Sequence, residues 1–223
     1  STVFNSLTGL NQHTGNWPGK TVGSAEGVAR YAHQSYLLVD TPGAYSLIPR
    51  SAEEEVTRDF LCSGQAAGVI IVCDATCLER NLNLVLQILE ITDRAVVCLN
   101  LMDEAARKGI EISPDLLAGR LGVPVVPVTA RRNQGLDEVM RQISLLLAAP
   151  GASGRRDITY PQHLEQAISS LELLIHSLTQ CAAGSRWLSL RLLEKETDCL
   201  AGQPVGEIAQ NPLVAAQLAE IWA

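Results

Sequence analysis

The sequence predicts an α/β protein with a mostly parallel sheet covered by helices on both faces, followed by a small all-helical domain. Three observations lead to this class. Between residues 67 and 148, short apolar runs alternate with segments of helical periodicity, which is typical of parallel strands buried on both faces. Two apolar runs end in polar residues at a turn, as strands do where a ligand binds at the carboxyl edge of a sheet. Beyond residue 156 only helical periodicity remains.

The composition limits what the chain can do. Its 223 residues, 47% of them hydrophobic, suffice for one α/β domain and a smaller unit, and disorder is not expected. A net charge of −7 argues against a nucleic-acid partner held by phosphate contacts. The six cysteines show no Cys-x-x-Cys spacing, which indicates reduced and mostly buried thiols. No signal peptide is visible and no apolar run approaches the ~20 residues of a membrane span, so we expect a soluble protein.

The first forty residues predict a helix, a long loop and a hairpin. Ser1–Leu10 has its apolar residues on one helical face. Asn11–Val22 is polar and contains Gly15, Pro18 and Gly19, and a long ordered loop of this kind is usually functional. Glu26–Tyr31 and Tyr36–Asp40 are two strand candidates joined by a short connection, which favours an antiparallel hairpin.

A helix at Ala52–Cys62 precedes the alternating part, with Ser51 as its N-cap and Glu54 completing a capping box. Strands are expected at Ala67–Cys73, Arg94–Leu99 and Val123–Val128. Helices are expected at Glu79–Thr92, Glu104–Lys108, Pro114–Leu121 (capped by Ser113) and Leu136–Ala148. The composition of residues 149–156 is that of a linker, so we expect one domain at 1–148 and a helical domain at 157–223.

Two strand ends carry residues that point to chemistry. In Leu37-Leu38-Val39-Asp40-Thr41-Pro42-Gly43 an apolar run delivers a carboxylate directly before a Pro-Gly turn. Asp40 can hold Mg²⁺ through water, and the Gly43 N–H can approach a terminal phosphate because no Cβ blocks it. Taken alone, this pattern is as typical of an ordinary strand end as of a phosphate site. In Asn100-Leu101-Met102-Asp103, the aspartate can accept from the ring N–H and the exocyclic amino group of guanine, an arrangement that adenine lacks.

Five segments together resemble a known family. They are Phe4-Asn5-Ser6-Leu7-Thr8-Gly9, Gly15-Asn16-Trp17-Pro18-Gly19, Asp40-Thr41-Pro42-Gly43-Ala44-Tyr45-Ser46-Leu47, Leu78-Glu79-Arg80-Asn81-Leu82 and Asn100-Leu101-Met102-Asp103. The combination resembles the cytosolic G domain of bacterial ferrous iron transport protein B (FeoB), and the tail with Arg186-Trp187-Leu188 resembles that family's helical domain, which is similar to a guanine-dissociation inhibitor. The resemblance implies a P-loop GTPase-type sheet and binding of GTP, GDP and Mg²⁺. It also implies slow GTP hydrolysis in a switch that regulates Fe²⁺ uptake.

The resemblance implies roles for individual residues. Ser1, Thr21 and Asp40 would bind Mg²⁺, and Thr21 and Gly43 would act at the γ-phosphate during hydrolysis. Asn100 and Asp103 would bind the base, and a backbone N–H of the Thr129-Ala130-Arg131 loop would read the guanine oxygen. The other nucleotide contacts would come from the same motifs, at Gly19, Lys20, Val22, Thr41, Pro42, Leu101 and Met102. Lys20 stands where many relatives have an apolar residue.

The chain departs from the usual GTPase pattern in two ways. The phosphate loop, Gly-x-x-x-x-Gly-Lys-Ser/Thr, would end at Ser1. We expect this loop and its strand to precede the sequence rather than to be deleted, because a sheet of this size would be strongly destabilised without a central strand. Ala44 follows Asp-x-Pro-Gly, where many GTPases use glutamine to orient water. Hydrolysis should therefore be slow unless the loop backbone, a K⁺ ion or a partner stabilises the transition state.

The resemblance implies a location on the cytoplasmic face of the bacterial inner membrane, joined to a C-terminal transmembrane iron-permeation domain of the same polypeptide. It leaves open a small SH3-like accessory protein, activation by K⁺ and a homo-oligomer. Two other functions stay open. One is a soluble, Era-like GTPase of ribosome or RNA maturation, which the excess of acidic over basic residues in Asp157–Ala223 disfavours. The other is a non-hydrolysing interaction module built on a degenerate fold.

Overall fold

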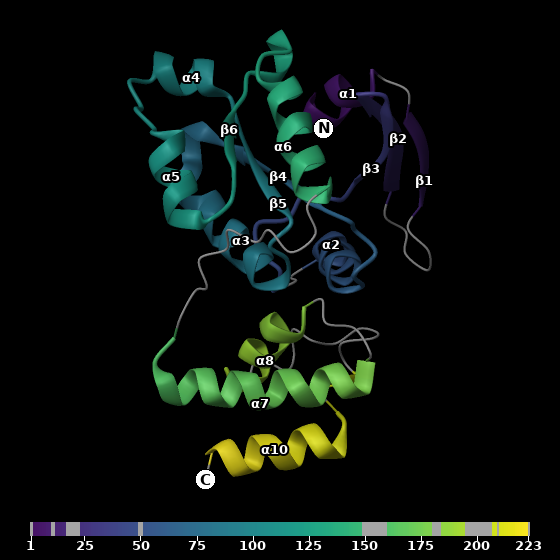
Figure 1. The fold of residues 1–223 in the computed structure, drawn as a ribbon, viewed down its shortest axis with the longest axis vertical. Helices are drawn as coiled ribbons and strands as arrows, with labels where there is room; N and C mark the ends of the chain where they lie inside the picture. Colours follow the sequence, from purple (N-terminus) through teal and green to yellow (C-terminus); the bar gives the residue numbers. More distant parts are fainter. Residues whose placement is uncertain are drawn as a thin grey trace.

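The computed structural model contains two three-stranded sheets, a parallel one surrounded by helices and an antiparallel one at the edge of the molecule (Figure 1). The structure describes residues 2–9, 12–16, 23–48, 51–148, 160–179, 184–194, 207–208 and 210–222. The antiparallel sheet has the order β1 (Gln12–Asn16), β2 (Gly23–Tyr31), β3 (Gln34–Asp40). The parallel sheet has the order β4 (Val69–Asp74), β5 (Ala95–Asn100), β6 (Val125–Pro127). The α/β class is confirmed, and β2 and β3 form the predicted hairpin.

Helices cover both faces of the parallel sheet because successive residues of a strand point in opposite directions. On β5, Val96 and Cys98 pack in a cluster with the helices α1 and α6, whereas Val97 and Leu99 pack on the other face with α3. All four side chains are fully buried, which explains the continuous apolar sequence of this strand. The helices of this part are α1 (Thr2–Thr8), α2 (Ala52–Cys62), α3 (Leu78–Ile91), α4 (Met102–Arg107), α5 (Pro114–Leu121) and α6 (Leu136–Ala148).

The long loop predicted over Asn11–Val22 is wrong in its first half, because Gln12–Asn16 forms strand β1. This strand pairs antiparallel with β2, in a register that runs from Gln12 opposite Gly27 to Asn16 opposite Gly23. Its sequence is polar and contains a glycine, so the apolar alternation that marks a buried strand is missing. Main-chain hydrogen bonds to β2 can hold an edge strand without that pattern. Residues 17–22 lie outside the described part of the chain.

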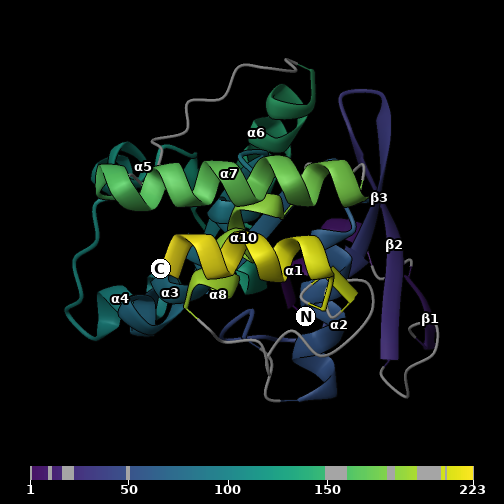
Figure 2. The same ribbon diagram turned by 90° about the horizontal axis from the view of Figure 1, so that it is seen from below.

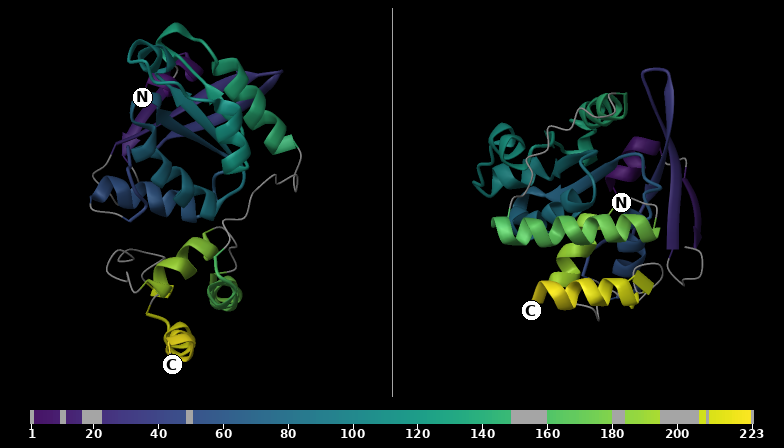
Figure 3. Two further views of the ribbon diagram at one scale, coloured as in Figure 1. Left: turned by 90° about the vertical axis from the view of Figure 1, so that its left-hand side faces the viewer. Right: turned by 60° about the horizontal axis from the view of Figure 1, so that its bottom comes forward.

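Three helices follow the α/β part, α7 (Gln162–Thr179), α8 (Ser185–Leu193) and α10 (Pro212–Trp222). Figures 1 and 2 show α7 and α10 side by side at one end of the molecule, and Figure 3 shows α8 between them and α3. Trp187, Leu188 and Leu192 of α8 belong to the same buried cluster as Leu99 of β5. The helical character predicted for the tail is observed in its described residues. Its division from residues 1–148 as a separate domain stays a prediction, and the proposed linker lies outside the described residues.

An ion-pair network joins α3, α7 and α8. From α8, Arg186 donates Nε to Oε2 of Glu90 on α3, at 3.0 Å. Its two terminal nitrogens form a fork on Glu165 of α7, with Nη1–Oε2 at 3.1 Å and Nη2–Oε1 at 2.9 Å. The hydrogen bonds from Arg186 hold the pKa of Glu165 below its ordinary value. No helix within the described residues is long and apolar enough to span a membrane.

Candidate nucleotide-binding site

The carboxyl end of β5 brings two distant segments together. Asn100 is the last residue of β5, and its Oδ1 accepts a hydrogen bond of 3.1 Å from the backbone N–H of Ala130. Only Leu101, in the left-handed conformation with φ 63°, separates β5 from α4. Met102 then donates its N–H to the carbonyl of Val128, at 3.3 Å. The two segments that the sequence predicts to bind a base, 100–103 and 129–131, are therefore neighbours in the structure.

The loop that follows β6 is held by its own backbone. Thr129 and Gln134 pair across it, with the Thr129 N–H donated to the Gln134 carbonyl at 3.0 Å. Gly135 closes the turn with φ +82°, and a Cβ there would lie 2.3 Å from the carbonyl oxygen of Pro127. Real Cβ atoms do not approach a backbone oxygen so closely, so this position requires glycine. The loop therefore presents Ala130 and its neighbours in a fixed position.

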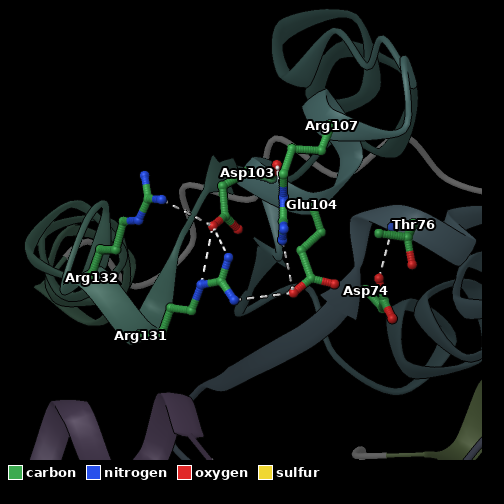
Figure 4. Close-up of polar contacts among 7 residues, drawn as sticks. All are labelled: Asp74, Thr76, Asp103, Glu104, Arg107, Arg131 and Arg132. Carbon is green, nitrogen blue, oxygen red and sulfur yellow. Dashed lines mark hydrogen bonds and ion pairs between the residues drawn. The ribbon is translucent and has the colours of Figure 1, made fainter.

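Asp103 lies in the first turn of α4 and faces this loop (Figure 4). Its Oδ2 accepts hydrogen bonds from Nε of Arg131, at 3.1 Å, and from Nη2 of the same residue. Arg132 lies farther away, with Nη2 at 3.8 Å from Oδ2. The hydrogen bond from Arg131 holds the pKa of Asp103 below its ordinary range. The other oxygen, Oδ1, is buried and has no hydrogen-bond partner within the described residues.

A second group of predicted residues lies at the end of β3. Asp40 is the last residue of this strand and stands opposite Ala25 of β2. The turn that follows is fixed to α2, because the Thr57 hydroxyl donates to the Pro42 carbonyl at 2.8 Å. A Cβ added to Gly43 would meet no atom within 4 Å. Packing therefore does not require glycine at this position, and the space beside it suits the close approach of a ligand.

The segment after Gly43 is held in place by three residues whose role here was not predicted from the sequence. Oε1 of Gln87, on α3, accepts from the backbone N–H of Leu47 at 2.6 Å. Glu54 accepts from the backbone N–H of Tyr45 at 3.3 Å, and the guanidinium of Arg80 lies 3.7 Å from the centre of the Tyr45 ring. From the sequence, Glu54 was assigned only a capping role and Arg80 only a place in a motif. The polar residue Gln87 within an apolar stretch of helix was a sequence signal that could have indicated a buried hydrogen bond from this helix.

The remaining predicted contacts, Ser1, Gly19, Lys20, Thr21 and Val22, lie outside the described residues, so Asp40 is the one proposed Mg²⁺ ligand that the structure places. The described part of the chain contains no group of three or more His, Cys, Asp or Glu side chains suited to a metal.

A cavity of about 1000 Å³ lies elsewhere, between residues 45–48, α3 and α8, and Asp103 does not line it. Cys73 and Cys98 are buried as predicted, but Cys77 is exposed and Cys62 is half-buried.

The fold, together with polar residues at the ends of β3 and β5, defines an α/β protein of the G-domain class, and the solved G domain of the T. maritima FeoB iron transporter is among its structural matches. A model of the family "Ferrous iron transport protein B" matches residues 1–143. The chain therefore belongs to the ferrous iron transport protein B (FeoB) family.

Individual relatives agree with this assignment. The Fe²⁺ transporter FeoB of Salmonella typhimurium is 35% identical over 217 residues, which cover 95% of this chain and 27% of the relative. The cytosolic domain of T. maritima FeoB in a GDP form matches with a TM-score of 0.80 and 28% identity, over 99% of this chain and 91% of that one. A GDP-bound E67A mutant of S. thermophilus NFeoB matches with a TM-score of 0.82 and 32% identity, over 99% of this chain and 81% of that one.

These matches confirm the resemblance predicted from the sequence, and they do not support the alternative of a GTPase of ribosome maturation. The chain spans about a quarter of the length of the curated relatives it matches. What those longer proteins do is therefore a proposal for this chain.

Proposed function

We propose that this chain binds guanine nucleotides, hydrolyses GTP slowly and, within a longer transporter, regulates Fe²⁺ uptake. The observation that carries the proposal is the Asp103 carboxylate beside Asn100 and the 129–131 loop, with Oδ1 buried and unpaired within the described residues. An unpaired buried acceptor is unfavourable, so the arrangement favours a ligand that supplies N–H donors. Guanine supplies two, from its ring and its amino group, whereas adenine offers neither in that arrangement.

The phosphates and Mg²⁺ are proposed to bind at the end of β3. Asp40, with Ser1 and Thr21, would hold Mg²⁺, which supplies positive charge to a transferring phosphoryl group. The Gly43 N–H would approach the γ-phosphate, in agreement with the open space beside this residue. Thr57 supports this role because it fixes the turn from α2.

Slow hydrolysis follows from the residue after Gly43. Ala44 has no polar group, so it cannot orient the attacking water as glutamine does in many GTPases. Stabilisation of the transition state is then left to the loop backbone, a K⁺ ion or a partner. A slow reaction suits a switch, in which the time spent in each nucleotide state carries the signal.

The proposed partner is a transmembrane iron-permeation part of the same polypeptide, with this chain on the cytoplasmic face of the membrane. The match to only 27% of the length of a curated Fe²⁺ transporter supports this proposal. A small SH3-like accessory protein and a homo-oligomer stay predictions from the family resemblance.

The test is the replacement Asp103→Asn in the full-length protein. Calorimetry should show GDP affinity falling by roughly tenfold or more, because the carboxylate partner of the guanine amino group becomes an amide. Xanthine nucleotides should gain affinity, since they carry a carbonyl at that position. Asp115→Asn is the matched control, because Asp115 also lies in the first turn of a helix, α5, but outside the two segments 100–103 and 129–131.

Two results would contradict the proposal. Equal binding of GDP and ADP by the unaltered protein would show that Asp103 does not read a guanine base. An absence of phosphate release from GTP, with K⁺ and Mg²⁺ present, would favour the non-hydrolysing interaction module.

A further inference from the structure

The guanidinium of Arg131 fills one oxygen of the carboxylate that is proposed to bind the base. Its Nε lies 3.1 Å from Oδ2 of Asp103, and its Nη2 donates to the same oxygen (Figure 4). Its Nη1 reaches Oε1 of Glu104 at 3.3 Å, so the group spans two carboxylates in the first turn of α4. A carboxylate oxygen has two lone pairs, and two donors from Arg131 therefore saturate Oδ2.

Arginine and guanine present similar donors to a carboxylate. In guanine, the ring N–H and the amino group are attached to one carbon, as Nε and Nη2 are in the arginine side chain. A carboxylate can accept hydrogen bonds from the paired donors of arginine and also from those of guanine, and both kinds of bond are charge-assisted because the carboxylate is ionised. The two N–H bonds of guanine are nearly parallel, so each points at a different oxygen of the carboxylate, and full pairing requires both Oδ1 and Oδ2. With Oδ2 saturated by Arg131, one of the two guanine donors has no acceptor. Arg131 and a fully paired base therefore exclude each other.

The contact can break without opening the loop. The Arg131 side chain is 45% exposed, whereas that of Asp103 is 13% exposed. Ion pairs with an exposed partner are weak, because water solvates the charge that is released. The backbone around Arg131 stays in place through the hydrogen bond between Ala130 and Asn100 and the pairing of Thr129 with Gln134. Rotation of one side chain is therefore enough to clear the carboxylate.

We infer that Arg131 determines affinity for guanine by acting as an intramolecular competitor: it occupies the base-reading carboxylate in the nucleotide-free protein, and guanine must displace it. The inference rests on the proposed function, because it requires Asp103 to bind guanine. When only a fraction of the protein molecules is free to bind a ligand, the observed affinity is the intrinsic affinity multiplied by that fraction. Arg131 therefore weakens nucleotide binding and favours release of the bound nucleotide.

The experiment compares Arg131→Met and Arg132→Met in the full-length protein, with GDP as the probe. Methionine keeps an unbranched side chain and removes the donors. Arg131→Met should raise GDP affinity about two- to fivefold, the range expected from loss of one exposed ion pair. Arg132→Met is the matched control, because Arg132 is 60% exposed and lies 3.8 Å from Oδ2. In 1 M salt, where exposed charges are screened, Arg131→Met and the unaltered protein should bind GDP with nearly equal affinity.

A second measurement follows Arg131 itself by ¹⁵N NMR of the arginine Nε–H groups. The Arg131 signal should move to the position of a solvated arginine when GDP saturates the protein, and also in nucleotide-free Asp103→Asn. A signal that GDP leaves unmoved, or a GDP affinity that Arg131→Met leaves equal or lowers, would overturn the inference while the proposed function stands. Equal binding of GDP and ADP by every variant would overturn the proposed function, and this inference with it.

Discussion

Replacing Arg186 by methionine should lower the free energy of unfolding by about 3 kcal/mol. The Arg186 side chain is 14% exposed and that of Glu90 is 6% exposed, so the change removes the cation from a nearly buried carboxylate. Breaking a buried ion pair by removing one partner costs about 3–5 kcal/mol. The lower end applies because Glu165, the second partner, is 29% exposed and water can solvate it. For a chain of this size the melting temperature should fall by roughly 6–12 °C.

Urea unfolding measures this change, followed by far-UV circular dichroism and by tryptophan fluorescence, to which the buried Trp187 contributes. Arg141→Met is the matched control, because Arg141 pairs with Glu138 on α6 but both side chains are more than 40% exposed. It should change stability much less. The double variant Arg186→Met/Glu90→Gln should recover part of the loss, since neither buried charge remains. The reasoning fails if Arg186→Met costs no more than Arg141→Met.

The same variant should show a defined dependence on pH. Because Arg186 lowers the pKa of Glu165 from its ordinary value of 4.5, the folded protein favours the ionised carboxylate. This contribution is present above the unfolded pKa and is lost as the pH falls through the lowered folded value. The stability difference between the unaltered protein and Arg186→Met should therefore shrink below about pH 4.5. A difference that stays constant down to pH 3 would contradict the role given to Glu165.

Two further predictions concern the nucleotide site. Gly135→Ala should destabilise the protein by about 1–3 kcal/mol and weaken GDP binding, because its positive φ and the close Pro127 carbonyl exclude a Cβ. Gly119→Ala is its control, since a Cβ there meets no atom within 4 Å and alanine favours the α5 helix by about 0.5–1 kcal/mol; a loss of stability as large as that of Gly135→Ala would contradict the argument. Thr21→Ala should leave GDP affinity nearly unchanged and slow GTP hydrolysis, measured by phosphate release, because GDP lacks the γ-phosphate that Thr21 is predicted to approach. A GDP affinity that falls as steeply as the rate would exclude this role.

The sequence predicted those elements whose residues are specified by burial or by local hydrogen bonds. Strand β5 was located because both of its faces are buried, which requires an unbroken apolar run. The starts of α2 and α5 were located because the hydroxyls of Ser51 and Ser113 accept from backbone N–H groups three residues on, at 3.3 Å in each helix. In the candidate site, the positions of Asn100 and Asp103 could be predicted because both lie within one turn of the end of β5, whereas their role in binding a base stays a prediction.

Features that depend on a partner distant in sequence were not predictable in this way. Strand β1 exists through the backbone of β2, and its own side chains carry no strand pattern. Gln87 binds the segment after Gly43 from 40 residues away, and a single polar residue on a helix does not indicate its partner. The pairing of Arg131 with Asp103 joins residues 28 apart in the sequence. Charge alone could not distinguish Arg131 from Arg132 as the closer partner.

The single left-handed residue between β5 and α4 restricts the backbone of the segment that is proposed to bind the base. Leucine rarely adopts this conformation, which costs roughly 1–2 kcal/mol for a residue with a Cβ. Glycine at position 101 would relieve that strain, but it would also let the strand end and the helix start reorient, so leucine favours one geometry at some cost in stability. Asn100 and Asp103 are consequently set by the backbone before any ligand arrives. If chains with this turn bind nucleotides as proposed, we expect their affinities to differ through exposed side chains near the turn, such as Arg131, rather than through the turn itself.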